Sequence, residues 1–474
     1  MRVVLEGLIT FFGGLIFIYM AAVILVYSTM LVLALIHLRK QYLIDKSEFA
    51  EDYVHAMHWK PVSIIIPVYN EEAGIIDSIH SLLNLRYPQT ELIIVNDGST
   101  DHTQQLAIEK FRMIPVQMDI LEQVPTKPIK QIYRSEIHPN LLLIEKENGG
   151  KADALNVGIN ASRFPYFCSI DGDSILEESS LLSVMKPIMK SNGDVIAAGG
   201  NIRIANGLDI QLGAVFQSDL SKNALVVMQI VEYLRAFLMG RIALSKFNLV
   251  LIISGAFSVF SKKWVIEAGG YSTNTVGEDM ELVVRLHRLI KEKKEKKRIE
   301  FVPEPVCWTE APQTLSVLRK QRRRWQQGLV QSLWRHKKMT FNPKYGGIGL
   351  ISFPYFWLIE GLGPIIELGG YVYVLIAFFL GDIYYEFALL LILLFILYGT
   401  VFSVASILLE AWSMNTYPKL KDVFRLMIMS LTEVFWYKPL TLIWRFEGFI
   451  HFLRRKEDWG QMKRVGLSKK GISE

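Results

Sequence analysis

The chain has 474 residues, 51% of them hydrophobic, and its mean hydropathy of +0.26 is high for a soluble protein. Its net charge of +6 is modest for this length, and charge alone does not separate a surface that meets anionic lipid from one that meets nucleic acid. The two cysteines, Cys168 and Cys307, have no metal-ligand spacing, so they imply no disulfide framework and favour a reducing compartment.

Residues 7–38 form an apolar stretch without an acidic or basic side chain apart from one histidine. A secretory signal would have a shorter apolar region and a small-residue cleavage site. One helix crosses a bilayer with about 20 residues and two helices with a turn need about 40, so the stretch predicts one long or tilted span. Arg39, Lys40 and Lys46 follow it and Arg2 precedes it, which predicts a cytoplasmic C-terminal end.

The middle of the chain alternates short apolar runs with amphipathic segments. Near-continuous apolar runs rich in β-branched residues predict strands of a parallel sheet that is covered on both faces. The predicted strands are 62–70, 91–99, 141–147 and 165–173, and the predicted helices are 71–84, 100–112 and 150–161. This pattern predicts an α/β, doubly wound domain, a fold that binds ligands at the carboxyl ends of its strands.

Polar residues gather at those strand ends, namely Asn70, Glu71, Asp97, Asp171 and Asp173. Two carboxylates one residue apart repel each other unless a cation lies between them or one is protonated. Oxygen ligands of this kind suit Mg²⁺ or Mn²⁺ that is also held by phosphates. The alternative is a polar turn in which Asp173 caps a following helix.

Residues 349–380 and 386–409 are apolar and predict two spans joined by a short outer loop. The first contains Glu360, Pro364 and Glu367, so its start is expected to be interfacial or broken.

Residues 423–445 are a further apolar candidate that contains Glu433 and Lys438. A full crossing would place the basic C-terminal tail outside, against the loop-charge rule, so a re-entrant or interface-lying segment is favoured. The two charges are expected either to pair with each other or to face a bundle interior or a water-filled path.

Six motifs in order resemble the family-2 membrane glycosyltransferases, whose processive members include cellulose, hyaluronan and poly-N-acetylglucosamine synthases. Each motif alone is weak, but their order between apolar segments is specific. The motifs are PVYNE (67–71), NDGS (96–99), GGKADALN (149–156), DGDS (171–174), GEDMEL (277–282) and QRRRW (321–325). The resemblance covers the globular middle and the flanking spans, and it implies a nucleotide-sugar-binding domain of the GT-A type.

Matched position by position, the resemblance implies a nucleotide-binding side. Asp97 is expected near the uridine and diphosphate, and the backbone from Tyr69 to Glu71 is expected to shape the nucleobase pocket. Lys151 is expected near the diphosphate, and Asp171 belongs to the same nucleotide-binding set.

The resemblance also implies the metal and the catalytic base. Asp171 and Asp173 are expected to hold Mg²⁺ or Mn²⁺ on the phosphates of the nucleotide. Asp279 corresponds to the general base, with Glu278 beside it. A carboxylate in that role takes the proton of the acceptor hydroxyl. The alternative for GEDMELVVRLHR is an ordinary helix start with acids at its positive end.

Gln321, Arg324 and Trp325 match the Q-x-x-R-W signature, which implies contacts with the acceptor and the diphosphate next to the membrane. The planar guanidinium of Arg324 suits phosphate, and the indole of Trp325 offers a flat apolar face to a sugar ring. The alternative is a basic helix that lies on anionic lipid.

The activity implied is that of a metal-dependent, inverting hexosyltransferase that polymerises UDP-N-acetylglucosamine or UDP-glucose into a β-linked exopolysaccharide and secretes it through its own helices. One alternative is a non-processive transferase that loads one sugar onto a lipid phosphate. Another is a membrane transporter or scaffold whose globular domain only binds nucleotide. The stretch IISGAF (252–257) replaces a Cys-containing motif of cellulose and hyaluronan synthases, which leans towards the poly-N-acetylglucosamine side or a less studied glucan synthase.

Four parts are expected in a multi-pass plasma-membrane protein with a cytoplasmic catalytic domain. They are a transmembrane helix (1–39), the glycosyltransferase domain (40–345), transmembrane and interfacial helices (346–452) and a basic cytosolic tail (453–474). The expected partners are a UDP-sugar, the growing polysaccharide and the lipid bilayer. An accessory subunit is left open, and nucleic acid is not expected.

Overall fold

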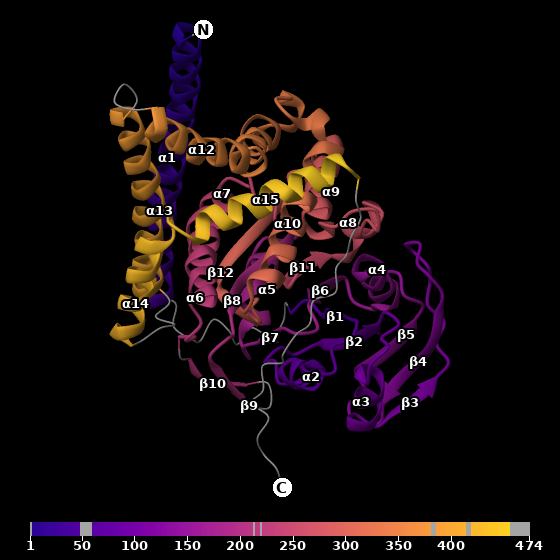
Figure 1. Ribbon diagram of the computed structural model, residues 1–474. Helices are drawn as coiled ribbons and strands as arrows, with labels where there is room; N and C mark the ends of the chain where they lie inside the picture. Colours follow the sequence, from indigo (N-terminus) through magenta and orange to yellow (C-terminus); the bar gives the residue numbers. More distant parts are fainter. Residues whose placement is uncertain are drawn as a thin grey trace. The chain divides into compact units, whose positions relative to one another are not determined.

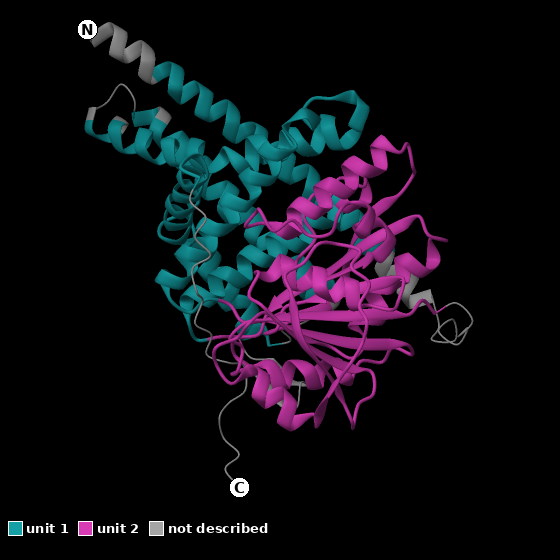
Figure 2. Ribbon diagram, turned by 90° about the vertical axis from the view of Figure 1, so that its right-hand side faces the viewer, with its two compact units in different colours: residues 1–43, 222–244, 312–460 teal, residues 44–221, 245–311, 461–474 magenta. Residues whose placement is uncertain are grey.

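The computed structural model describes residues 2–47, 59–211, 214–218, 220–380, 385–413 and 419–455. The chain forms two compact units, each assembled from separate stretches of sequence (Figure 2). The sheet unit lies within residues 44–221 and 245–311, and the helical unit within residues 1–43, 222–244 and 312–460. Most of the expected tail lies outside the described residues, and the expected domain boundaries stay a prediction.

A mixed sheet forms the core of the sheet unit (Figure 1). Within the described residues it has ten strands. In spatial order they are β3 (Met113–Val116), β4 (Ile129–Ser135), β5 (Leu141–Lys146), β2 (Thr90–Asn96), β1 (Val62–Val68), β6 (Tyr166–Ile170), β11 (Phe257–Ser261), β8 (Val195–Ile204), β12 (Arg298–Thr309) and β7 (Ile175–Leu176).

The four predicted strands are confirmed as β1, β2, β5 and β6, which lie side by side and run parallel. Their side chains are almost all buried, as a sheet covered on both faces requires. The sheet departs from the predicted parallel pattern at β11, which pairs antiparallel with both β6 and β8. The parallel arrangement therefore holds for the four predicted strands at the centre of the sheet and again for the pair β8 and β12, whereas β3, β4, β7 and β11 pair antiparallel with their neighbours.

The strand order reverses beside β1. The chain steps from β1 to β2 to β5 in one direction and then returns to β6 on the other side of β1. Right-handed crossovers consequently place the helix after β5 on the opposite face from the helices after β1 and β2. These helices are α2 (Ile75–Leu83), α3 (Thr103–Lys110) and α4 (Lys151–Ala161). Ligands of such folds bind at this reversal, where the carboxyl ends of neighbouring strands diverge.

The remaining elements of the sheet unit flank this frame. Helix α5 packs against β8 and β12. A separate antiparallel pair is formed by β9 and β10. The bounds are α5 (Ser180–Lys190), α8 (Lys262–Glu267), α9 (Glu278–Glu292), β9 (Leu208–Gln211) and β10 (Ala214–Ser218).

The helical unit contains long apolar helices and several short, irregular ones. Its elements are α1 (Arg2–Ser47), α6 (Ala224–Leu234), η3 (Arg235–Arg241), α7 (Ile242–Lys246, which crosses the unit boundary), α10 (Leu315–Arg335), η4 (Lys337–Met339), η5 (Pro343–Tyr345), η6 (Ile348–Ser352), α11 (Phe353–Tyr355), η7 (Phe356–Gly361), α12 (Gly363–Leu380), α13 (Tyr385–Ser413), α14 (Leu420–Thr432) and α15 (Tyr437–Leu453).

Three helices in the described part of the chain are long and apolar enough to cross a membrane: Thr10–Lys40, Ile348–Ile376 and Ala388–Ser413. They coincide with the three predicted apolar spans, and the expected irregular start of the second is seen in the succession of short helices before α12. The ambiguous segment 423–445 falls on α14 and α15, which are bent by 63° at a short break. A broken span or a re-entrant loop has this form, so the segment is not one straight helix.

Glu433 and Lys438 lie at this bend and have different partners. Glu433 forms an ion pair with Arg235 at 2.8 Å and accepts a hydrogen bond from the Ser403 hydroxyl, also at 2.8 Å. Lys438 forms an ion pair with Glu367 at 2.8 Å. The expectation that the two charges pair with each other is wrong. Each is instead buried in the interior of the helical unit, where an opposite charge offsets the cost of its desolvation.

Candidate active site

The two aspartates of the D-x-D motif follow β6 directly. Asp171 remains about a quarter exposed, and its Oδ1 lies 2.5 Å from the Nζ of Lys151. Asp173 is almost buried, and the Thr309 hydroxyl donates to its Oδ2 at 3.4 Å. The next element is the strand β7, and helix α5 begins only at Ser180. The alternative that Asp173 caps a following helix is therefore wrong.

Lys151 is the first residue of α4, and it meets a second carboxylate from a distant part of the chain. Its Nζ lies 3.6 Å from Oε1 of Glu278, the first residue of α9. Burial acts to lower the pKa of Lys151, but the neighbouring carboxylates, with Asp171 foremost, outweigh burial and raise the pKa above its usual value. Lys151 therefore carries its positive charge throughout the physiological pH range.

Asp279 lies beside the same lysine. Its Oδ1 accepts a hydrogen bond from the Met280 N–H at 2.8 Å, and its Oδ2 accepts one from the Gly255 N–H at 3.3 Å. A methyl group at Gly255 would lie 3.3 Å from both the Lys151 Nζ and the Asp279 Cβ, so only a small residue fits there without crowding. One ammonium thus faces three carboxylates, which come from two separate motifs.

The predicted nucleobase segment adjoins the D-x-D turn. Tyr69 is 39% exposed and available to a ligand. Asn70 has a φ of +56°, and its side-chain oxygen accepts a hydrogen bond from the Thr100 N–H at 2.8 Å, which joins this turn to the NDGS motif. A methyl group at Gly172 would lie 3.4 Å from the Cγ of Glu71. Tyr69, Glu71 and the D-x-D turn are therefore neighbours at the carboxyl ends of β1 and β6.

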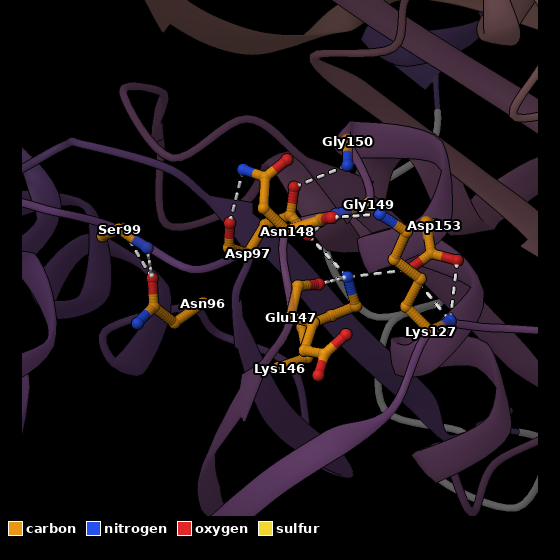
Figure 3. Close-up of polar contacts among 10 residues, drawn as sticks. All are labelled: Asn96, Asp97, Ser99, Lys127, Lys146, Glu147, Asn148, Gly149, Gly150 and Asp153. Carbon is orange, nitrogen blue, oxygen red and sulfur yellow. Dashed lines mark hydrogen bonds and ion pairs between the residues drawn. The ribbon is translucent and has the colours of Figure 1, made fainter.

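Asp97 follows β2 and is nearly buried, with several donors around its carboxylate (Figure 3). Its Oδ1 accepts from the Gly149 N–H at 2.9 Å and its Oδ2 from the Gly150 N–H at 2.7 Å. Lys146, which sequence reasoning missed, also donates to Oδ1 at 2.6 Å. The sequence does contain an indication of this role. Lys146 ends the apolar run of β5, and a lysine in a buried strand is almost always paired with an acidic partner.

The Q-x-x-R-W residues lie on α10 in the helical unit, whereas the other predicted site residues lie in the sheet unit. Gln321 and Arg324 are half-buried, and Trp325 is 43% exposed. The guanidinium of Arg322 lies 4.3 Å from the centroid of the Trp325 ring, and its Nη2 donates to Glu232 at 2.8 Å.

Arg322 is another residue that sequence reasoning passed over. It lies three positions before Trp325, and residues with that spacing share one helix face.

The donor set at the end of β6 fits a divalent cation. Among the described residues, no group of three or more histidine, cysteine, aspartate or glutamate side chains is arranged to hold a metal ion. Mg²⁺ and Mn²⁺ in nucleotide sites need fewer protein ligands, because one or two carboxylates act together with phosphate oxygens. Asp171 already attracts a cationic group, the ammonium of Lys151, to its partly exposed carboxylate. The two aspartates therefore provide suitable oxygen ligands.

Comparison with known families gives two matches. Residues 167–404 match the family described as "Glycosyl transferase family group 2", and residues 63–117 match "Glycosyl transferase family 2". The first match alone spans 238 of the 474 residues. Between them the matches include the PVYNE, NDGS, D-x-D, GEDMEL and QRRRW motifs.

The chain is also similar to curated synthases. It is 30% identical over 295 residues to the poly-beta-1,6-N-acetyl-D-glucosamine synthase of Staphylococcus aureus (strain COL) and 28% identical over 295 residues to that of Staphylococcus epidermidis. Each alignment covers 62% of this chain and 60% of the relative, so the chain matches less than two thirds of these relatives' length.

Among solved structures, the mannosyltransferase PcManGT from Pyrobaculum calidifontis, in complex with GDP-Man and Mn²⁺, has a similar fold. The TM-score is 0.51 at 16% sequence identity, and the alignment covers 93% of this chain and all of that chain. The mixed sheet with its parallel centre is accordingly a GT-A-like fold, as predicted.

Proposed function

Because the chain belongs to glycosyl transferase family group 2, we propose that it polymerises UDP-N-acetylglucosamine or UDP-glucose into a β-linked exopolysaccharide at a membrane. The observation that carries this proposal is the similarity over 295 residues to poly-beta-1,6-N-acetyl-D-glucosamine synthases. The three apolar helices long enough to cross a membrane support an enzyme that works at a lipid bilayer.

In the proposed reaction, an acceptor hydroxyl attacks C1 of the donor sugar while the bond from C1 to the diphosphate oxygen breaks. Asp279 takes the hydroxyl proton, and UDP leaves with the bonding electron pair. A single displacement of this kind inverts the configuration at C1. The contacts of Asp279 with the Gly255 and Met280 N–H groups support this role, because they fix the carboxylate beside Lys151. Glu278 forms a further ion pair with the ammonium of Lys151.

The diphosphate is proposed to bind near Lys151, whose positive charge offsets the negative charge of the leaving group. Asp171 and Asp173 are the residues that would hold Mg²⁺ or Mn²⁺. When bound, such an ion supplies further positive charge to the phosphate oxygens.

Tyr69, Glu71 and Asp97 are proposed to bind the nucleoside. The contacts of Asp97 with described residues occupy three of the roughly four lone-pair positions of a carboxylate, which leaves one for a nucleobase N–H.

The acceptor end is proposed to involve Gln321, Arg324 and Trp325. The exposed indole of Trp325 supports contact with a sugar ring, and cation–π stacking on Arg322 fixes the orientation of that indole. Arg324 is proposed to bind the diphosphate with its planar donors.

The membrane arrangement is also proposed. The catalytic domain (40–345) faces the cytoplasm, with one span before it (1–39) and the remaining helices after it (346–452). The polymer leaves through these helices, and an accessory subunit can join them. The basic residues that follow the first apolar stretch support this orientation.

Purified full-length protein in detergent, given either UDP-sugar labelled with carbon-14, tests the proposal. We expect ethanol-insoluble label with one of the two donors in the presence of Mg²⁺ or Mn²⁺, and no such label with Asp279→Asn. Label that partitions into organic solvent would instead indicate transfer to a lipid acceptor. If neither fraction is labelled with either donor, the proposed substrates are wrong.

A further inference from the structure

A fully buried lysine lies between two buried aspartates close to the proposed diphosphate site (Figure 3). Lys146 ends β5, and its side chain has no exposed surface. Its Nζ lies 2.6 Å from Oδ1 of Asp97 and 2.7 Å from Oδ2 of Asp153. These three residues, which we name the Lys146 cluster, join the ends of β2 and β5 to the first turn of α4.

Three oxygen atoms lie against this ammonium. Besides the two carboxylates, Lys146 contacts the main-chain oxygen of Glu147, to which it donates a hydrogen bond at 2.5 Å. An ammonium has three N–H bonds, and these contacts surround it with protein oxygen atoms. A charge buried in this way has no capacity left for a substrate. Its role has to be sought in what the cluster holds in place.

The cluster holds the loop that leads into α4. The carboxylate of Asp97 accepts hydrogen bonds from the N–H groups of Gly149 and Gly150. The main-chain oxygen of Asp97 accepts a hydrogen bond from the side-chain amide of Asn148 at 2.8 Å. Gly150 caps α4 with a φ of +86°, a conformation that favours glycine. The next residue is Lys151. The backbone that is hydrogen-bonded to Asp97 therefore fixes the position from which the Lys151 side chain extends.

The opposite side of the loop is held by Asp153. Its Oδ1 accepts a hydrogen bond from the Lys127 N–H at 3.1 Å, and the Lys127 ammonium donates to the Asn148 oxygen at 2.6 Å. A methyl group at Gly149 would overlap the Asp153 carboxylate. The loop is therefore enclosed from both sides, and its backbone has little room to shift.

We propose that Lys146 is a positioning residue: by joining Asp97 to Asp153, it fixes the 147–150 loop and thereby places the Lys151 ammonium against Asp171 and Glu278. Its importance for turnover rests on the proposed function, because Lys151 is assigned to the diphosphate there. The placement of Lys151 itself does not depend on which nucleotide binds.

Charge balance explains why an uncharged residue at position 146 would move the loop. Without the ammonium, Asp97 and Asp153 would be two buried carboxylates that face each other's repulsion. This repulsion drives the two carboxylates apart. Since Asp97 holds Gly149 and Gly150, movement of its carboxylate displaces the start of α4.

Lys151 reactivity gives a readout that needs no nucleotide. Full-length protein in detergent is treated with limiting acetic anhydride at pH 8, and acetylation of each lysine is measured by peptide mass spectrometry. In the native protein, two ion pairs occupy the ammonium of Lys151 and slow its reaction. In Lys146→Met these contacts are weakened, so we expect acetylation of Lys151 to rise by about threefold or more. The exposed Lys110 is the internal control and should not change.

Nucleotide inhibition gives the second readout. Displacing Lys151 should weaken inhibition by UDP by about tenfold, because charge-assisted hydrogen bonds to the diphosphate are lost. Inhibition by uridine, which has no phosphate and reports only the nucleoside contacts of Asp97 and its neighbours, should weaken by a smaller factor than inhibition by UDP. Equal losses for the two ligands would contradict the proposal, because they would show that Lys146 supports the nucleoside contacts and not the position of Lys151. Absence of inhibition of the native protein by UDP would contradict the proposed function, while the acetylation result would still decide the role of Lys146.

A second variant separates positioning from charge balance and covers the case in which Lys146→Met does not fold. Lys146→Met/Asp153→Asn removes one positive and one negative charge, so the repulsion is relieved. We expect its thermal midpoint to lie above that of Lys146→Met. Lys151 acetylation should nevertheless stay above the native level, because no ammonium joins Asp97 to the side chain at position 153. Native acetylation of Lys151 in either folded variant would overturn the proposal, because it would show that the loop keeps its place without the lysine.

Discussion

Lys146 and Lys151 lie five positions apart, and each contacts two carboxylates, yet their surroundings differ. Lys146 has no exposed surface, and its partners Asp97 and Asp153 are 5% and 6% exposed. Lys151 is 24% exposed, and its partner Asp171 is 26% exposed. The two groups have similar chemistry, but only the second has an ammonium that can exchange a protein contact for a ligand.

The difference shows how one short loop can combine rigidity with access. We call an ion pair sealed when both of its side chains are buried. Such a pair is costly to break, because removing one partner leaves a buried charge. An accessible pair can accept a phosphate or a metal ion at lower cost, since water already solvates part of it. Substitutions in the accessible group are therefore expected to reduce turnover with little effect on stability, and substitutions in sealed groups are expected to change stability first.

The largest effect is expected at the D-x-D motif. Asp171→Asn or Asp173→Asn should reduce turnover in Mg²⁺ or Mn²⁺ by at least about 10⁴-fold, because the several kcal/mol that a metal supplies to phosphate charge would be lost. Treatment of the native protein with EDTA should have a similar effect, reversed by added metal. The thermal unfolding midpoints of both variants should lie within a few degrees of that of the native protein. Near-normal turnover of either variant would contradict the metal assignment.

Asp279→Asn should reduce the turnover number by about 10³-fold, since a general base contributes about 10²- to 10⁴-fold. The amide keeps an oxygen that can accept from the Gly255 N–H, so UDP affinity measured by calorimetry should change by less than about twofold. A parallel loss of UDP affinity and turnover would assign Asp279 to nucleotide binding rather than to proton transfer.

Lys151→Met should weaken UDP binding by about tenfold to 10²-fold and uridine binding hardly at all, because the ammonium contributes to phosphate contacts alone. Competitive inhibition of turnover by the two ligands provides the measurement. Lys110→Met, at an exposed position of the same unit, is the matched control and should behave as the native protein does. An equal loss for UDP and uridine would mean that Lys151 supports the fold instead.

The smallest effect is expected at a sealed group outside the site. His287 is buried, its Nε2–H donates to the Val250 oxygen at 2.9 Å, and burial lowers its pKa from 6.5 to about 4. The unfolded chain therefore takes up a proton more readily, so the stabilisation is complete above pH 6.5 and is lost as pH falls towards 4. The loss amounts to about 2 kcal/mol at pH 5.

Thermal midpoints of the native protein and of His287→Gln, measured from pH 7 to pH 5, check this effect. The midpoint of the variant should fall less steeply with acid than that of the native protein. Identical slopes would exclude His287 as the titrating group.

The centre of the fold was predictable because its strands are apolar on both faces. The runs that became β1, β2, β5 and β6 have no amphipathic alternation, and burial between two helix layers is the arrangement that tolerates this. The antiparallel β11 was not predicted. Four of its five residues are buried, as in the central strands, and strand direction depends on the path of the chain, which local periodicity does not record.

The candidate site was predictable where chemistry follows a strand end, as at Asp97 and Asp171. Lys146 and Arg322 were missed for a physical reason: their importance comes from partners far away in the sequence. Lys146 binds Asp97 and Asp153, and Arg322 binds Glu232. In the sequence, the only indication of such a long-range pair is a charged residue at a position that the surrounding pattern predicts to be buried.

The most direct test of the account is an experimental structure of the full-length protein with UDP and Mn²⁺. We predict that the ion lies between the carboxylates of Asp171 and Asp173 and the diphosphate, and that Lys151 lies within hydrogen-bond reach of a phosphate oxygen. UDP bound elsewhere, or aspartates turned away from an empty carboxyl end of β6, would contradict the account.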